Sequence, residues 1–252
     1  MEDMPIEIER IRDSEKLRAW RHVGYSKRLV LCFSGLGKNQ SQPPGYEFAS
    51  IATGGGADHV LYIADPNRSW LNEPGFLEET LDLIKETMAD IGAEQVVALG
   101  HSMGGFSACV IPYFIPVDYV LALSPQVSIH PEVVPDDGRW MQHRESVDDI
   151  EIVDVGSYLE DRTQYVVVFG RHGREAPQRS RFPNPDNLTL FVMPQTNHNT
   201  AARLKSLGLL TDLRDAVFDG DLETAKALMI GGARAHILEE DSNATPAEAP
   251  SE

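Results

Sequence analysis

The 252-residue chain contains only two cysteines, Cys32 and Cys109, which excludes a disulfide framework. One lies in an apolar strand-like segment and the other in a helical one, so both are expected to be buried thiols. The sequence also lacks any apolar run near the roughly 18 residues that a membrane span needs. Its first residues, MEDMPIEIERIRD, are acidic and have no apolar core, which excludes a secretory signal. We therefore expect a cytoplasmic protein without a membrane span.

Positive charge is scarce, since 22 Lys and Arg face 39 Asp and Glu, giving a formal net charge of −17. This balance argues against a nucleic acid or an anionic membrane surface as partner. Five of the acidic residues lie within the last 14, so the overall charge says little about a substrate. Motifs for bound metals or nucleotides are also missing, because there is no Cys/His cluster, H-E-x-x-H or P-loop. No cofactor is expected.

Strand-like apolar segments alternate with helical patterns along most of the chain. Near-continuous runs of Val, Leu and Ile are typical of parallel strands that are covered on both faces. Their alternation with helices, the clearest of which covers residues 76–91, predicts a doubly wound, mostly parallel α/β sheet. The predicted strands cover residues 28–34, 59–65, 96–99, 118–124, 165–170 and 188–193.

Three segments depart from this alternation. Residues 126–161 are rich in Pro, Asp and Glu, and they predict an excursion that is either a small cap beside the site or a surface insertion. Residues 209–238 predict a C-terminal helix hairpin that packs on a main domain of residues 1–208. Residues 239–252 have the Ala, Pro, Glu and Ser composition of a disordered acidic tail. The sequence does not indicate an oligomeric state.

Residues 95–105 read QVVALGHSMGG, an apolar strand that continues into Gly-x-Ser-x-Gly and then into small residues. This pattern predicts a nucleophile elbow, a strand-to-helix turn that strains its central serine and exposes the hydroxyl. Gly100 and Gly104 fall where a Cβ would collide across the turn, and Gly105 allows the helix to approach the sheet. Ser102 is therefore the predicted nucleophile.

With these strands in place, residues 28–208 resemble the α/β-hydrolase superfamily. Its catalytic order is Ser, then an acid, then His, each at the C-terminal end of a strand. The resemblance implies a base after the last strand, and His198 is the only histidine in residues 194–200. His172, after the strand at 165–170, is the second candidate.

The acid departs from the family pattern. The family usually supplies an Asp in G-x-x-D after the penultimate strand, and this chain has Gly173 at that position. Glu175 follows two residues later and is the first candidate, although it could equally be a solvated loop charge. Asp154 is the second candidate, and a Ser–His pair oriented by a backbone carbonyl is the third.

The resemblance also implies an oxyanion hole, formed by the N–H groups of Met103 and of Leu36 in the loop 34–37. Arg68 and Trp70 follow the strand at 59–65 and are predicted to lie at the rim of the same crevice. There Arg68 could clamp a carboxylate or phosphate, and Trp70 could pack on an acyl chain or a sugar ring. The alternative for both is local packing.

Three functions remain open at this point. The first is a serine hydrolase that cleaves an acyl ester or thioester through an acyl-enzyme on Ser102. The second is an acyltransferase that uses the same site. The third is a catalytically silent α/β-hydrolase fold used for binding, which the missing Asp and the appended hairpin favour. A strained Ser102 together with His198 favours an enzyme.

Overall fold

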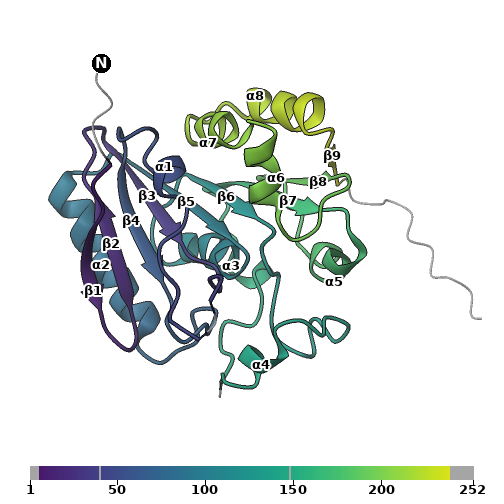
Figure 1. Ribbon diagram of the computed structural model, residues 1–252, viewed down its shortest axis with the longest axis horizontal. Helices are drawn as coiled ribbons and strands as arrows, with labels where there is room; N and C mark the ends of the chain where they lie inside the picture. Colours follow the sequence, from purple (N-terminus) through teal and green to yellow (C-terminus); the bar gives the residue numbers. More distant parts are fainter. Residues whose placement is uncertain (1–5, 40, 148, 239–252) are drawn as a thin grey trace, which may run out of the picture.

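The computed structural model describes residues 6–39, 41–147 and 149–238, and its centre is one mostly parallel sheet (Figure 1). The strands are arranged in the order β1-β2-β4-β3-β5-β6-β7-β8-β9. The six central strands are parallel to one another and nearly fully buried, as their Val- and Leu-rich sequences predict. They are β3 (Arg28–Phe33), β4 (His59–Ala64), β5 (Gln95–His101), β6 (Tyr119–Leu123), β7 (Gln164–Gly170) and β8 (Leu188–Met193).

The sheet is extended at both edges by antiparallel strands that the sequence did not predict. β1 (Glu9–Asp13) pairs with β2 (Arg18–His22), and β2 pairs with β4. β9 (His236–Ile237) pairs with β8 at the opposite edge. β1 reads ERIRD and is almost wholly exposed, so it carries no apolar signal, and β9 has only two residues.

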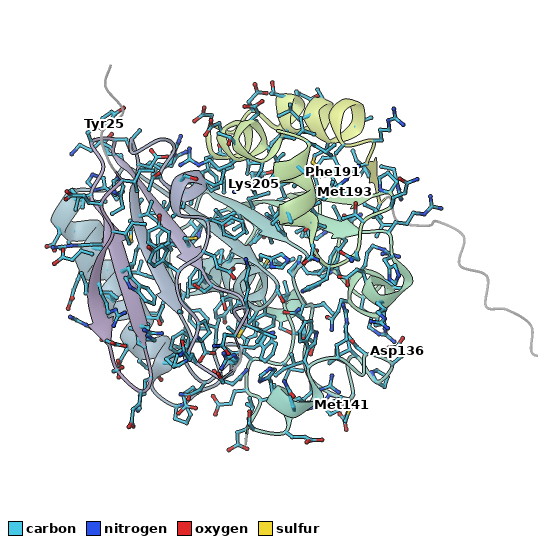
Figure 2. All side chains as sticks on the ribbon, in the orientation of Figure 1. Tyr25, Asp136, Met141, Phe191, Met193 and Lys205 are labelled. Atoms are coloured by element: carbon cyan, nitrogen blue, oxygen red, sulfur yellow. The ribbon has the colours of Figure 1, made fainter. Side chains whose placement is uncertain are left out.

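Helices cover both faces of the sheet and create two apolar layers (Figure 1). α2 (Phe76–Ile91) and α3 (Met103–Val110) pack on one face. The other face carries α1 (Ala49–Ala52), α6 (Thr200–Ser206), α7 (Leu210–Phe218) and α8 (Leu222–Ala227). Phe191 and Met193 of β8, labelled in Figure 2, belong to this second layer. The predicted doubly wound α/β architecture is confirmed.

The excursion at 126–161 lies beside the carboxyl ends of the central strands. It contains the short helix α4 (Met141–Arg144) and buries Ile129, Val134 and Val155 in the apolar layer that also holds α2 and α3. Its Trp140 ring lies 5.4 Å from the ring of His198. The excursion therefore packs against the sheet with α2 and α3, and it forms part of the wall around His198.

The C-terminal helices α7 and α8 pack against the sheet through the second apolar layer. The Asp221 side chain accepts a hydrogen bond from the Thr224 N–H at 3.0 Å and caps the start of α8. Arg214 of α7 is buried and pairs with Asp58, the residue before β4, which joins α7 to the sheet. The predicted tail at 239–252 lies outside the described residues. Among the residues described, no helix has the length and apolarity that crossing a membrane requires.

Candidate active site

The turn between β5 and α3 holds Ser102 in a strained conformation, with φ 59° and ψ −123°. Two close backbone approaches explain the glycines around it. A Cβ on Gly100 would lie 2.0 Å from the carbonyl oxygen of Gly104, and one on Gly104 would lie 2.1 Å from that of Phe33. Only glycine fits at either position, so the Gly-x-Ser-x-Gly pattern is a steric requirement of this turn.

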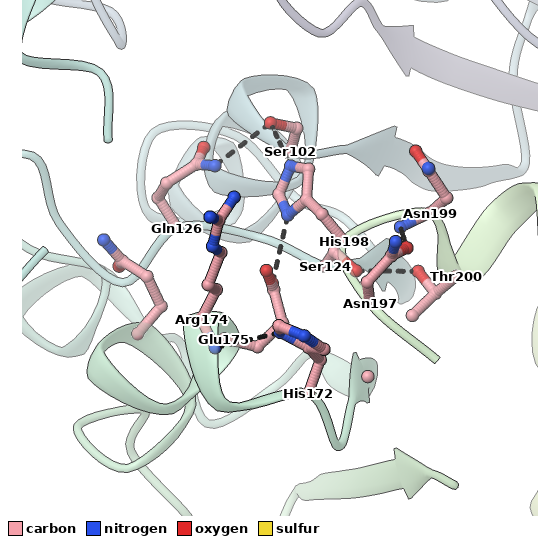
Figure 3. A network of polar contacts seen from close by, with 12 residues as sticks. Ser102, Ser124, Gln126, His172, Arg174, Glu175, Asn197, His198, Asn199 and Thr200 are labelled. Carbon is pink, nitrogen blue, oxygen red and sulfur yellow. Dashed lines mark hydrogen bonds and ion pairs between the residues drawn. The ribbon is translucent and has the colours of Figure 1, made fainter. Parts of the chain in front are cut away.

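Three side chains from three strand ends form a continuous hydrogen-bonded chain (Figure 3). His198, in the loop after β8, places Nε2 2.8 Å from Oγ of Ser102. Its Nδ1 lies 3.0 Å from Oε2 of Glu175, which follows β7. The structure therefore brings together the predicted nucleophile, the predicted base and the first candidate for the acid.

The loops that carry His198 and Glu175 are joined to each other. A Cβ on Gly170 would lie 2.3 Å from the carbonyl oxygen of Thr196, so the two loops touch where only glycine fits. The backbone N–H of His172 donates to the same carbonyl at 3.0 Å. The ring nitrogen Nδ1 of His172 accepts a hydrogen bond from the backbone N–H of Arg174 at 3.2 Å. His172, the second candidate for the base, thus caps the turn that presents the acid.

Glu175 is 1% exposed and is held by two partners. Arg139 of the excursion lies 2.5 Å from its Oε1 and also pairs with Asp137. Burial acts to raise the pKa of Glu175, but the hydrogen bonds and charges of His198 and Arg139 outweigh it. The pKa is consequently below its ordinary value, and the carboxylate stays ionised beside the His198 ring.

Asp154, the second candidate for the acid, takes part in a different contact. Its carboxylate accepts hydrogen bonds from the backbone N–H of Ser157 at 2.9 Å and from the Ser157 hydroxyl at 3.0 Å. These bonds close a turn in the excursion. The ring nitrogen that Asp154 could have oriented is instead bonded to Glu175.

His101, the residue before the nucleophile, contacts the backbone of His198. Its Nε2 lies 2.8 Å from the backbone oxygen of His198, so the Nε2–H group donates a hydrogen bond to that carbonyl. Burial, with repulsion from His198, lowers the pKa of His101 to about 4. The ring is neutral at ordinary pH and holds the backbone of the His198 loop.

Gln126, in the loop that follows β6, also contacts the nucleophile. Its Nε2 donates to Oγ of Ser102 at 3.0 Å, and its Oε1 accepts from the indole N–H of Trp70 at 3.1 Å. Because the serine oxygen accepts this bond, its own proton is free to point at His198. Gln126 follows the end of β6 on the correct edge of the sheet, and that position was its only sequence signal.

The prediction that Arg68 and Trp70 lie at the rim of the crevice is wrong. Trp70 is 0% exposed and Arg68 is 7% exposed. Positive φ angles of 55° at Arg68 and 53° at Trp70 turn the chain back after β4, so both side chains lie beneath the site. Arg68 donates to the backbone oxygens of Leu36 at 3.0 Å and of Gln42 at 2.7 Å, which holds the loop after β3 in place.

The two amides predicted for the oxyanion hole belong to Met103, the residue after the nucleophile, and to Leu36 in the loop after β3. Met103 is the first residue of α3, so its N–H has no carbonyl partner within the helix. Leu36 is buried, and in the described part of the chain its N–H donates to no other group. The neighbouring Gly35 N–H donates to Glu47 at 3.2 Å, and burial raises the pKa of that carboxyl.

A cavity of about 390 Å³ opens over Ser102 and His198. Apolar side chains from four segments form much of its wall, among them Leu36, Phe48, Trp140 and Ala201. Trp140, and not Trp70, therefore lines the cavity over the nucleophile. Within residues 6–39, 41–147 and 149–238, no cluster of three His, Cys, Asp or Glu side chains could hold a metal ion.

The mostly parallel sheet carries a strained serine between β5 and α3, an acid after β7 and a histidine after β8. This arrangement is that of the α/β-hydrolase fold, and this chain has that fold. It is similar to Est1E from Butyrivibrio proteoclasticus, with 13% identity and a TM-score of 0.58 over 87% of this chain and 99% of that one. It is also similar to Pyrococcus horikoshii acylaminoacyl peptidase, with 10% identity and a TM-score of 0.61 over 85% of this chain and 42% of that one.

A third similar structure is the Glycosylation Associate Protein (Gap123) complex from Streptococcus agalactiae. It has 13% identity and a TM-score of 0.58 over 82% of this chain and 46% of that one. The chain thus spans less than half the length of this protein and of the peptidase. No protein-family model matches the chain, and no curated protein matches it in sequence.

Proposed function

We propose that this protein is a serine hydrolase that cleaves an acyl ester or thioester through a covalent acyl-enzyme on Ser102. One observation carries the proposal, namely the unbroken hydrogen-bonded chain from Ser102 through His198 to Glu175. A serine hydroxyl is a poor nucleophile at neutral pH unless a base within hydrogen-bond reach takes its proton. The distances support that transfer, and the ionised acid supports the base.

In the acylation step, Oγ of Ser102 attacks the substrate carbonyl carbon while His198 Nε2 takes the hydroxyl proton. The carbonyl oxygen becomes negatively charged and accepts hydrogen bonds from the amides of Leu36 and Met103. Glu175 accepts a hydrogen bond from the Nδ1–H group of His198 and stabilises the imidazolium. His198 then gives its Nε2 proton to the departing alcohol or thiol, and the acyl group stays on Ser102.

Deacylation repeats these steps with water as the nucleophile. His198 takes a proton from the water as it attacks the acyl carbon, and then returns a proton to Oγ of Ser102. An acyltransferase would differ only in using an alcohol in place of water. The bond between Glu175 and His198 weakens the silent-fold alternative, because the missing Asp was one of its two supports.

The proposal is tested by measuring hydrolysis of a series of p-nitrophenyl esters and matched thioesters of increasing acyl length. We expect turnover of at least one substrate, and loss of that turnover by several orders of magnitude in Ser102→Ala. Ser180→Ala, which removes an exposed hydroxyl that donates to the backbone oxygen of Ala176, is the control and should retain activity. Adding a primary alcohol separates hydrolysis from acyl transfer through the ester product. Full activity in Ser102→Ala would overturn the proposal.

A further inference from the structure

The loops after β7 and β8 and the helix α6 border an open groove of about 740 Å³. Asn199 and Ala202 line both this groove and the cavity over Ser102, so the two spaces adjoin each other. Figure 3 shows His172, Asn197 and Asn199 of the groove around the loop that carries His198. A substrate that reacts at Ser102 can therefore extend into the groove.

The groove is basic in a chain of formal charge −17. Its lining includes Arg171 and Arg203 and no carboxylate. Both arginines are exposed, and within the described part of the chain neither makes an ion pair. The acid of the neighbouring turn, Glu175, is buried and pairs with Arg139 and His198. It therefore does not neutralise the two arginines of the groove.

The other polar groups in the groove add hydrogen-bond donors. His172 Nδ1 accepts the Arg174 N–H, so the neutral ring carries its proton on Nε2. The Asn197 side-chain oxygen accepts the Asn199 N–H at 3.0 Å, which leaves the two N–H donors of the Asn197 amide unused by that bond. Donors beside two unpaired guanidinium groups are the chemistry that binds an oxyanion.

We propose that this groove binds an anionic group, a carboxylate or a phosphate, on the leaving part of the substrate. The inference rests on the proposed function and names the substrate class. The leaving group is the part that His198 protonates, and the groove is bordered by the loop that carries His198. The acyl part would occupy the cavity that Phe48 and Trp140 line. Arg171 and Arg203, which make no ion pair among the described residues, would gain an anionic partner from the substrate.

Kinetics with three aryl acetates test the preference, using phenol leaving groups that carry a neutral carboxamide, a carboxylate or a phosphate. The variant is Arg171→Gln/Arg203→Gln. The control is Arg12→Gln/Lys226→Gln, which removes the same charge on β1 and α8, at positions outside the groove lining. We expect the ratio of kcat/KM for an anionic ester over the neutral one to fall at least ~10-fold in the variant and to stay constant in the control. An equal ratio in all three proteins would overturn the proposal.

Binding without turnover separates this proposal from the proposed function. Phenyl phosphate and benzoate are titrated into Ser102→Ala, and NMR measures their binding. The same titrations are made with Ser102→Ala that also carries Arg171→Gln and Arg203→Gln. Saturable binding of either anion that disappears with Arg171 and Arg203 supports the site, and the anion that binds identifies the carboxylate or the phosphate. Binding of neither, or binding that survives the loss of both arginines, overturns it. If no ester is cleaved but the arginine-dependent binding is seen, only the proposed function fails.

Discussion

Gln126 donates a hydrogen bond from Nε2 to Oγ of Ser102 at 3.0 Å, and both side chains are buried. The opposite end of the Gln126 amide is fixed by the indole N–H of Trp70, which is fully buried. The nucleophile is thus held between a rigid amide and the ring of His198. This arrangement selects the serine rotamer from which the proton points at the base.

Gln126→Leu is expected to lower kcat by about 10–100-fold, because a preorganised partner of the nucleophile is lost. KM should change less, since the amide acts on Ser102. Trp70→Phe should move kcat in the same direction by a smaller factor, because it removes only the bond that anchors Gln126. Steady-state kinetics check both. An unchanged kcat in Gln126→Leu would show that Ser102 is positioned without it.

Glu175→Gln is expected to fold and to lose about 10⁴-fold in kcat, because an amide cannot stabilise the imidazolium or hold the required tautomer. Asp154→Asn is the matched carboxylate control and should stay within about two-fold of the native protein, since Asp154 contacts Ser157 instead. Circular dichroism verifies folding of both variants. The assignment of the acid is wrong if Asp154→Asn shows the larger loss.

The titration of His101 predicts a pH dependence of stability. Its pKa in the folded protein is lowered from 6.5 to about 4, by burial and then by His198. Between these values the unfolded chain binds a proton and the folded protein does not, so the free energy of unfolding falls as pH decreases from 6.5 to 4. His101→Gln removes the titration and should flatten this dependence. Urea unfolding at several pH values measures it, and equal slopes in both proteins would contradict the prediction.

Two glycine-to-alanine changes, one in the elbow and one in the turn after β7, are expected to differ in their effect on stability. A Cβ at position 104 would lie 2.1 Å from the Phe33 carbonyl oxygen, so Gly104→Ala must move the backbone of β3 or α3. We expect a loss of about 3 kcal/mol in the free energy of unfolding, together with loss of activity. A Cβ at Gly173 meets no atom within 4 Å, so Gly173→Ala should remain close to the native stability. Thermal unfolding measures the stability of both variants. The steric account would be contradicted if Gly104→Ala were as stable as Gly173→Ala.

The central sheet could be predicted because each buried parallel strand leaves a continuous apolar run in the sequence. The position of Ser102 follows from the sterics of its turn, and strand order made His198 and Glu175 the first candidates for the base and the acid. The edge strands β1 and β9 could not be found in this way. One is exposed and charged, and the other has only two residues.

The errors at the site have one physical cause. The end of a strand predicts which edge of the sheet a residue occupies, but not the direction of its side chain. Arg68 and Trp70 have positive φ and point into the protein, whereas Trp140 of the excursion lines the cavity. Gln126 belongs to no motif, and its contact with Ser102 depends on the packing of two strand ends. Such contacts require the three-dimensional structure.

The central claim is that Ser102 is an activated nucleophile. The most direct test is labelling of the full chain with a fluorophosphonate probe, followed by mass spectrometry of the digested protein. We predict one adduct per chain on the peptide that contains Ser102, no adduct in Ser102→Ala, and much slower labelling in His198→Ala. Absence of labelling in the native protein, or an adduct that persists in Ser102→Ala, would contradict the account.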